Sequence, residues 1–306
     1  MNLTDVEHLN RRHAIAGHLN FTATDGFIFA EVENAHAHAR VALQGAQVVA
    51  WRPRGGAPVI WLSEQARFAA GKSIRGGVPV CWPWFGPHAT DAARPGHGYA
   101  RTVPWQLIAT EALAGGETRL TFALVESEAT AALWPHRTPV QAVITVGATL
   151  SVDLVTRNED DAPVTLGEAL HTYFQVGDIA EVEVQGLEGR SHVDKVDGGA
   201  RKTQQGPVSI AGEVDRVYLD TTDDVLIVDN KLRRRIRIAA ENARSTIVWN
   251  PWVDKAAKMG DLGEDGYRHM LCVESGNALD NVVTLAPGAE HRMGVTYRVE
   301  PLQGWS

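Results

Sequence analysis

The chain has 306 residues, 44% of them hydrophobic, which is enough to bury a large core and excludes a disordered protein. Its formal net charge of -8 argues against a nucleic-acid binder, because such proteins usually carry a basic surface. Two cysteines lie far apart in the chain, at Cys81 and Cys272, which excludes a disulfide framework and indicates a reducing compartment.

The first twenty residues mix acidic, basic and polar side chains and lack the apolar core of a signal peptide. No apolar run is long enough to span a bilayer. We therefore expect a cytoplasmic protein with no membrane partner and no nucleic-acid partner. No coiled coil or other assembly signal is present, so we expect a monomer.

Short apolar runs that end in turn residues occur along most of the chain. In chain order they are found at 39–53, 118–127, 142–160, 223–242, 245–251 and 269–277. The 142–160 run alternates Leu150, Val152 and Leu154 with polar residues, and the 223–242 run is divided into two strands by Asp229-Asn230. This pattern predicts an all-β fold, a sandwich or barrel, and no βαβ rhythm is present. We expect a single domain over residues 1–306.

Three short helices are also predicted. The first, at 63–71, has Ser63 as a possible N-cap and Gly71 just beyond its end. The second, at 127–135, begins at Ser127 and ends at Pro135, and the third covers 254–261.

Two segments combine basic residues with glycine. In IRGGVPVCWPWFGPH, at 74–88, Arg75 precedes two glycines, which permit close approach of a ligand to the backbone. A tight turn with a salt-bridged arginine would explain the same residues. In RPGHGYARTVPW, at 94–105, His97 lies between two glycines that offer it no packing, and Arg101 follows. A loop at a cleft and an ordinary exposed histidine are both compatible with this segment.

Two further segments combine an ionisable residue with apolar neighbours. His171 lies in LGEALHTYFQVGD, where apolar neighbours can hold the pKa of the imidazole near neutral, so that it can give or take a proton around pH 7. Glu274 follows the apolar run 270–273, and partial desolvation would raise the pKa of its carboxyl and make it a better base. A satisfied core histidine and a strand-end glutamate facing water are the alternatives.

The chain resembles the hexose-6-phosphate mutarotases, also called glucose-6-phosphate 1-epimerases, of the aldose-1-epimerase superfamily. The resemblance rests on five motifs in one order: SIRGGVPVCWPWFGPH, GHGYAR, EALHTYFQVGD, DRVY and VWNPW…HMLCVESGN. It covers most of the chain. It implies a large antiparallel β-sandwich of the galactose-mutarotase type with a few short helices. It also implies the interconversion of α and β anomers of a hexose-6-phosphate, with glucose-6-phosphate as the first choice, and no cofactor.

The resemblance also implies the roles of particular residues. His171 matches the catalytic acid, and Glu274 matches the catalytic base. The substrate-binding positions are Arg75, His97, Arg101 and Asp215. Arg75 and Arg101 are our choice for the phosphate, because they are the two arginines in these segments. We expect Trp82, Trp84 and Phe85 to form part of the pocket floor or to pack beneath it.

The implied chemistry fits these residue types. Ring opening needs a base for the anomeric hydroxyl and an acid for the ring oxygen, which we expect on opposite sides of the sugar. It needs no metal, and no metal-ligand cluster is evident. Three alternatives remain open: a mutarotase for unphosphorylated aldoses, a non-catalytic carbohydrate-binding β-sandwich, and a glycosidase, which usually requires two carboxylates.

Overall fold

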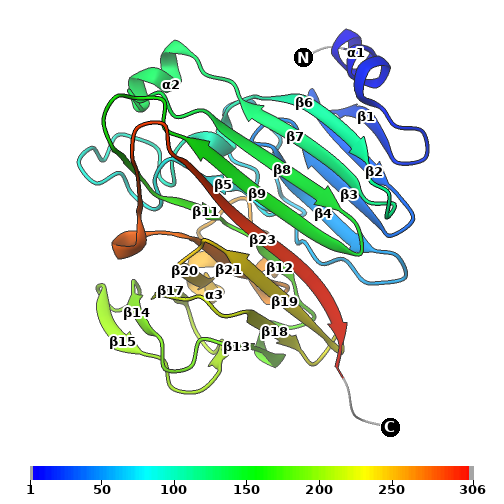
Figure 1. Ribbon diagram of the computed structural model, residues 1–306. Coiled ribbons are helices and arrows are strands. Elements are labelled where there is room, and N and C mark those ends of the chain that lie inside the picture. Colours follow the sequence, from blue (N-terminus) through cyan, green and yellow to red (C-terminus); the bar gives the residue numbers. More distant parts are fainter. Residues whose placement is uncertain (1–2, 303–306) are drawn as a thin grey trace.

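Antiparallel strands dominate the computed structural model, which describes residues 3–302 (Figure 1). Every pairing between named strands is antiparallel. The strands form sheets of nine, eight, four and two strands. The predicted all-β sandwich with a few short helices is therefore confirmed.

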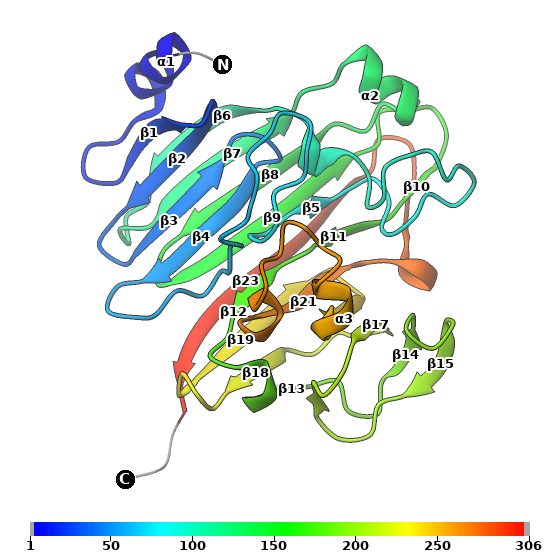
Figure 2. The ribbon, with the colours of Figure 1, turned by 180° about the vertical axis from the view of Figure 1, so that it is seen from behind.

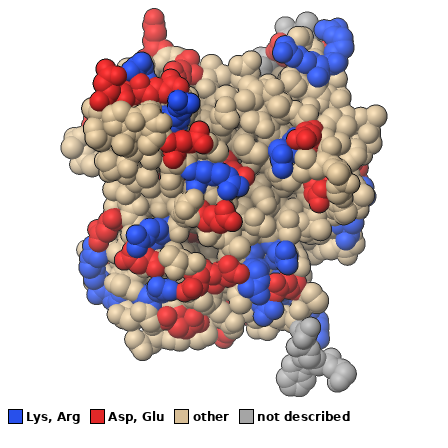
Figure 3. Space-filling view, in the orientation of Figure 1, with Lys and Arg blue, Asp and Glu red and all other residues tan. Residues whose placement is uncertain are grey.

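The nine-stranded sheet faces the viewer in Figure 1. Its strands, in spatial order, are β16 (Val208–Ser209), β13 (Val182–Gln185), β18 (Val225–Asp229), β19 (Arg234–Glu241), β23 (Glu290–Pro301), β9 (Thr149–Arg157), β8 (Val140–Val146), β7 (Thr118–Leu124) and β6 (Trp105–Ala112). Strand β9 alternates buried and half-buried residues, as its sequence predicted, so one side of the sheet faces the core. On the other side Arg235 and Arg237 both pair with Glu300, and Figure 3 shows basic beside acidic groups on this face.

The eight-stranded sheet lies behind it and carries the segments singled out in the sequence. Its strands, in spatial order, are β15 (Ala200–Thr203), β14 (Ser191–Asp194), β17 (Val214–Leu219), β20 (Ser245–Asn250), β21 (Met270–Asn277), β11 (Glu168–Leu170) and β5 (Val80–Cys81), with β12 (Tyr173–Gln175) also paired to β21. Figure 2 shows this sheet from its outer side, with α3 (Trp252–Ala256) in front of β21.

Two smaller sheets complete the strands. The four-stranded sheet consists of β1 (Leu19–Thr24), β2 (Phe27–Glu33), β3 (Ala37–Ala42) and β4 (Gln47–Pro53), in that order. The two-stranded sheet pairs β10 (Val164–Leu166) with β22 (Val283–Leu285).

The main hydrophobic core contains residues of the nine-, eight- and four-stranded sheets, and the residues of strand β21 divide between this core and a second cluster. Leu271 and Val273 belong to the main core, whereas Met270 and Cys272 pack in a second cluster with Trp61, Tyr173 and Trp249. Side chains alternate between the faces of a strand, so Glu274 lies on the same face as Cys272, away from the main core. This alternation gives the eight-stranded sheet an outer face with its own polar and aromatic residues.

Helices are short, and they test the three helix predictions. The structure has α1 (Leu3–His13), α2 (Glu128–Leu133), α3 and the 3₁₀ turns Ala100–Thr102, Ile179–Glu181, Gly266–Arg268 and Leu279–Asn281. The second predicted helix is confirmed by α2, and Ser127 caps it, since the Ser127 hydroxyl accepts from the amide of Thr130. The third predicted helix overlaps α3 by only a few residues. No helix among residues 3–302 is long and apolar enough to cross a membrane.

The helix predicted at 63–71 is absent, and the segment is an irregular loop. The Ser63 hydroxyl accepts from the amide of Gln65, as a cap would, but it also donates to the carbonyl of Asp261 at 2.6 Å. The Ser63 side chain, which we took for a local helix signal, therefore also bonds to a residue far along the chain.

Candidate active site

The strand register brings His171 and Glu274 into contact. β11 and β12 pair with β21 in one continuous register, which sets Leu170 opposite Ser275. The next position, His171, falls between the two ladders, and its Nε2 lies 3.4 Å from Oε1 of Glu274. We expected the acid and the base on opposite sides of a sugar. The structure instead places them side by side on the outer face of one sheet.

Burial controls the protonation of this pair, since Glu274 is 1% exposed and His171 is 8% exposed. Desolvation is the largest cause of both shifts: it raises the pKa of Glu274 well above its usual value and lowers the pKa of His171 well below. Both shifts favour the uncharged forms, so the pair holds one transferable proton. Oε2 of Glu274 and Nδ1 of His171 have no hydrogen-bond partner within the described residues.

His97 is held rigidly beside the pair. It adopts a positive φ of 64°, donates its amide to the carbonyl of Gly86, and accepts from the Gly86 amide at Nδ1. Its ring contacts Phe85 at 4.8 Å and His171 at 5.6 Å between centroids. Burial, followed by Arg101 and Lys195, lowers the pKa of His97 to about 3. The imidazole is therefore neutral at pH 7, with its proton on Nε2.

Arg75 reaches the pocket, but other residues hold its side chain. Its Nε donates to Asp261 at 3.1 Å, and Nη1 donates to the Tyr173 hydroxyl at 3.0 Å. Tyr173 in turn stacks on His171 with centroids 5.0 Å apart. The glycines after Arg75 have a different role from the one we expected: a Cβ on Gly77 would overlap the Val48 carbonyl, so the close approach is that of another strand.

Further basic side chains reach the same pocket. Arg101 donates from Nη2 to the carbonyl of Gly96 at 2.9 Å. Lys195, in the turn between β14 and β15, lies 3.7 Å from Asp215, measured from Nζ to Oδ1. Lys255, from α3, pairs with Glu213 at 2.7 Å. The distance from Lys195 to Asp215 is too long for a strong hydrogen bond, so this lysine is loosely held.

One pocket contains every site residue that the sequence predicted. These six are Arg75, His97, Arg101, His171, Asp215 and Glu274, and the rest of the lining is Ser73, Ile74, Pro79, Phe85, Tyr173, Lys195, Ile247, Trp249 and Lys255. Sequence reasoning missed Lys195, Lys255 and Trp249 as site residues. Trp249 lies in the VWNPW motif, which was a usable signal, whereas the two lysines stand in ordinary polar segments.

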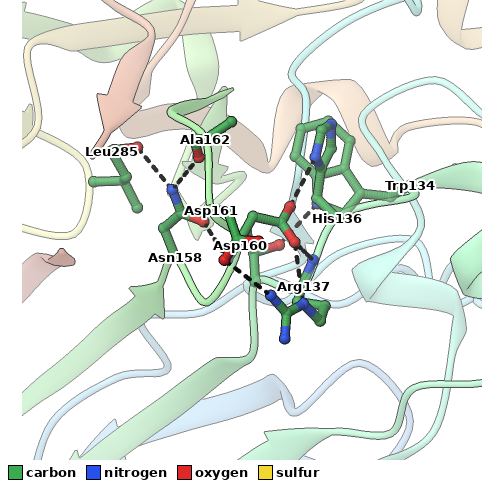
Figure 4. Close-up of polar contacts among 9 residues, drawn as sticks. Trp134, His136, Arg137, Asn158, Asp160, Asp161, Ala162 and Leu285 are labelled. Atoms are coloured by element: carbon green, nitrogen blue, oxygen red, sulfur yellow. Dashed lines mark hydrogen bonds and ion pairs between the residues drawn. The ribbon is translucent and has the colours of Figure 1, made fainter. Parts of the chain in front are cut away.

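Of the three aromatic residues expected at or beneath the pocket floor, one lines the pocket and two lie in the interior. Phe85 lines the pocket, whereas Trp82 and Trp84 belong to the main core. Behind Trp82 lies a smaller hollow that none of the six residues lines. Figure 4 shows part of its rim, where His136 and Arg137 both turn toward Asp160. Of the predicted floor, only Phe85 is therefore placed to meet a ligand.

The pocket and the fold together define a class of protein. A carboxyl–imidazole pair that shares one proton can transfer protons to and from a bound molecule. The neutral imidazole, carboxylate and cations around it suit a ligand with several hydroxyl groups and a negative charge. The pocket therefore has the groups that an acid–base enzyme needs, on an antiparallel β-sandwich.

Comparisons with known proteins define the family. A model of the aldose 1-epimerase family matches residues 30–298. A protein of Escherichia coli K12, proposed to be a glucose-6-phosphate 1-epimerase, is 42% identical over 248 residues, or 81% of this chain and 82% of that protein. A protein of Cenchrus ciliaris with the same proposed activity is 34% identical over 86% of this chain and 82% of its own.

A solved structure agrees with these sequences. The crystal structure of a proposed mutarotase from Salmonella typhimurium matches with a TM-score of 0.88 and 35% identity, over 94% of this chain and 96% of that one. The chain belongs to the aldose 1-epimerase family, and it is an isomerase. The predicted family and the predicted galactose-mutarotase type of sandwich are confirmed.

Proposed function

We propose that this isomerase interconverts the α and β anomers of a hexose-6-phosphate, with glucose-6-phosphate as the preferred substrate. The observation that carries the proposal is the buried contact of His171 with Glu274 in a pocket walled by basic side chains. The activity proposed for the relatives from Escherichia coli and Cenchrus ciliaris supports the phosphorylated substrate.

The proposed reaction opens and recloses the sugar ring. Glu274, as carboxylate, takes the proton of the anomeric hydroxyl, and His171, as imidazolium, gives a proton to the ring oxygen while its bond to the anomeric carbon breaks. The aldehyde then rotates, and the same groups return the protons as the ring closes on the other face. Both reacting oxygens are bonded to one carbon, so an acid and a base that lie side by side can serve both.

The neighbouring cations favour the charged form of Glu274 but not that of His171, because Arg101 lowers the pKa of both groups. The catalytic state needs the shared proton on His171 and a charge on Glu274, opposite to what burial favours. Lys195 and Arg101 oppose the burial effect, because both lower the pKa of Glu274. Proton transfer within the pair leaves its net charge unchanged, so it avoids the cost of creating a net charge in a buried site.

We assign the phosphate to Arg101 and Lys195, with Arg75 as a further contact. A dianion in a cleft requires cations with free donors. Arg101 uses one nitrogen on a backbone carbonyl, and Lys195 is loosely paired, whereas Arg75 already donates from two of its three nitrogens. Compared with our first choice of Arg75 and Arg101, this assignment adds Lys195 and makes Arg75 a secondary phosphate contact.

The test is anomer exchange measured by NMR magnetisation transfer on glucose-6-phosphate, free glucose and free galactose. Wild type is compared with His171→Asn and Glu274→Gln, and His18→Asn serves as a control because His18 lies outside the pocket. We expect fast exchange of the phosphosugar, a loss of about 10²–10⁴-fold in both site variants, and no loss in the control.

Other outcomes would change the proposal in different ways. Fast exchange of galactose alone would retain the acid–base mechanism and overturn the phosphorylated substrate. No acceleration of any sugar, with binding still detectable, would favour a non-catalytic carbohydrate-binding protein. Full activity in Glu274→Gln would remove the proposed base.

A further inference from the structure

A second set of polar side chains lies directly behind the catalytic pair, inside the sandwich. Glu168 and Thr172 are wholly buried and flank His171 on the opposite face of the same segment. Each contacts strand β23 of the nine-stranded sheet. Oε1 of Glu168 lies 2.7 Å from Nε2 of His291, and the hydroxyl of Thr172 lies 2.6 Å from that of Tyr297. None of these four side chains lines the pocket.

The backbone at His171 is bonded to its own sheet on the β5 side only. The ladder of β11 with β21 ends at Leu170, and the ladder of β12 begins at Tyr173. In the gap, the amide of His171 donates to the carbonyl of Pro79, and the amide of Thr172 donates to that of Leu170. At His171 and Thr172 the backbone is therefore not bonded to β21, the strand that carries the proposed base.

The interior bonds compensate for this gap. Glu168 also accepts from Nδ2 of Asn277 at 2.9 Å, so one carboxyl connects β11, β21 and β23. Thr172 connects the other side of the gap to β23 through Tyr297. His171 thus lies between two interior bonds that both end on one strand of the opposite sheet.

We propose that His291 and Tyr297 are positioning residues, which act through Glu168 and Thr172 to hold His171 at its distance from Glu274. This inference rests on the proposed function. The contact between the catalytic groups, at 3.4 Å, is at the long end of hydrogen-bond range, so a small shift of the segment separates them. Misplacement of a catalytic group by about 1 Å can cost about 10²-fold in rate.

Stability alone is a weak explanation for these bonds. A buried carboxyl–imidazole pair contributes little net stability, because desolvation offsets much of the attraction, and apolar residues of similar volume often do as well. Hydrogen bonds with fixed geometry differ from apolar contacts in specifying one position. A proton-transfer site requires such a position.

The test compares two tyrosine variants that lose the same kind of bond. Tyr297→Phe removes the hydroxyl that holds Thr172. Tyr218→Phe is the matched control, because its hydroxyl is equally buried and donates to Gln204 at 2.7 Å, outside the pocket. We expect Tyr297→Phe to lower kcat for glucose-6-phosphate about tenfold with KM changed less than about twofold, and Tyr218→Phe to leave kcat unchanged.

A second pair of variants protects the test against misfolding. Thr172→Val removes the other partner of the same bond, and Thr118→Val is its control, a wholly buried threonine that accepts from Asn34. Equal kcat in each variant and its control, at similar losses of Tm, would overturn the positioning role. A wild type that accelerates no sugar would overturn the proposed function first, and the positioning role with it.

Discussion

Two glutamate–histidine pairs lie on opposite faces of the same sheet, and they have opposite properties. The outer pair, Glu274 with His171, has a single contact of 3.4 Å, and burial lowers the pKa of its histidine. The inner pair, Glu168 with His291, has a contact of 2.7 Å, and the hydrogen bond to Glu168 raises the pKa of its histidine.

The difference comes from the neighbours and not from the residue types. Glu168 accepts from Asn277 as well as from His291, so its hydrogen bonds fix its position. Glu274 has no bond besides the long contact to His171 in the described part of the chain, and cations stand near it. A tightly bonded pair connects strands, whereas a loosely bonded pair can exchange protons with a ligand.

The largest expected effect is on the free energy of unfolding, which should depend much more on the inner pair than on the outer pair. Glu168→Ala leaves His291 and Asn277 without their acceptor and should lower the free energy of unfolding by about 3–5 kcal/mol, as for other broken buried pairs. Glu274→Gln should lower it little, because the variant removes a buried carboxyl that has no tight partner. Urea unfolding measures both. Equal losses would erase the distinction between the pairs.

The next largest effect is on KM, and it concerns only the pocket of the outer pair. Arg101→Ala should raise KM for glucose-6-phosphate far more than for free glucose, because a hydrogen bond to a charged group is worth about 1.5–3 kcal/mol, or about 10–100-fold. Arg235→Ala is the control, since Arg235 pairs with Glu300 on the far side of the other sheet. A similar rise for both sugars would remove Arg101 from the phosphate site.

The smallest effect is a pH trend of opposite sign for the two histidines, on the order of 1.4 kcal/mol per unit of pKa shift. The pKa of His291 is raised, so its contribution is complete below the unfolded value of 6.5 and is lost as pH rises through the folded value. The pKa of His171 is lowered, so the folded state loses stability as pH falls below 6.5.

Thermal unfolding of His291→Gln and His171→Asn beside wild type, from acid to neutral pH, measures these trends. His291→Gln should differ most from wild type, as a destabilised variant, at the acid end. His171→Asn should gain stability relative to wild type at the same end. A shared direction in the two variants would contradict the assignment of one pair as a bond and the other as a reactive site.

The sequence predicted those features that local patterns determine. Alternation in 142–160 and 223–242 identified β9, β18 and β19, and the segment between Ser127 and Pro135 identified α2. The helix α1 was not predicted. The helix predicted at 63–71 was wrong: Ser63 accepts from Gln65 only in a turn, and its hydroxyl also donates to Asp261, a contact that no local window contains. The single domain over 1–306, the cytoplasmic location and the monomeric state stay predictions.

The residues of the candidate site likewise divide into those that local motifs predicted and those that only the fold reveals. His171, Glu274 and the other predicted residues stand in unusual local motifs, so their types and neighbours pointed to them. Lys195 and Lys255 reach the pocket only because the fold brings the turn between β14 and β15 and the short helix α3 to it. The inner pair was invisible in the sequence, because Glu168 and His291 are 123 residues apart and meet only when the two large sheets pack.

The tight packing of the loop that carries His97 limits how directed evolution could alter the sugar preference. Gly98 lies so close to the Trp82 carbonyl that a Cβ there would overlap it, so this wall of the pocket tolerates no substitution at that position. Lys195 and Lys255 also line the pocket, but they are solvent-accessible and come from a turn and a short helix. Mutant libraries directed at the turn and at α3 should therefore yield more folded variants than libraries directed at the glycine loop.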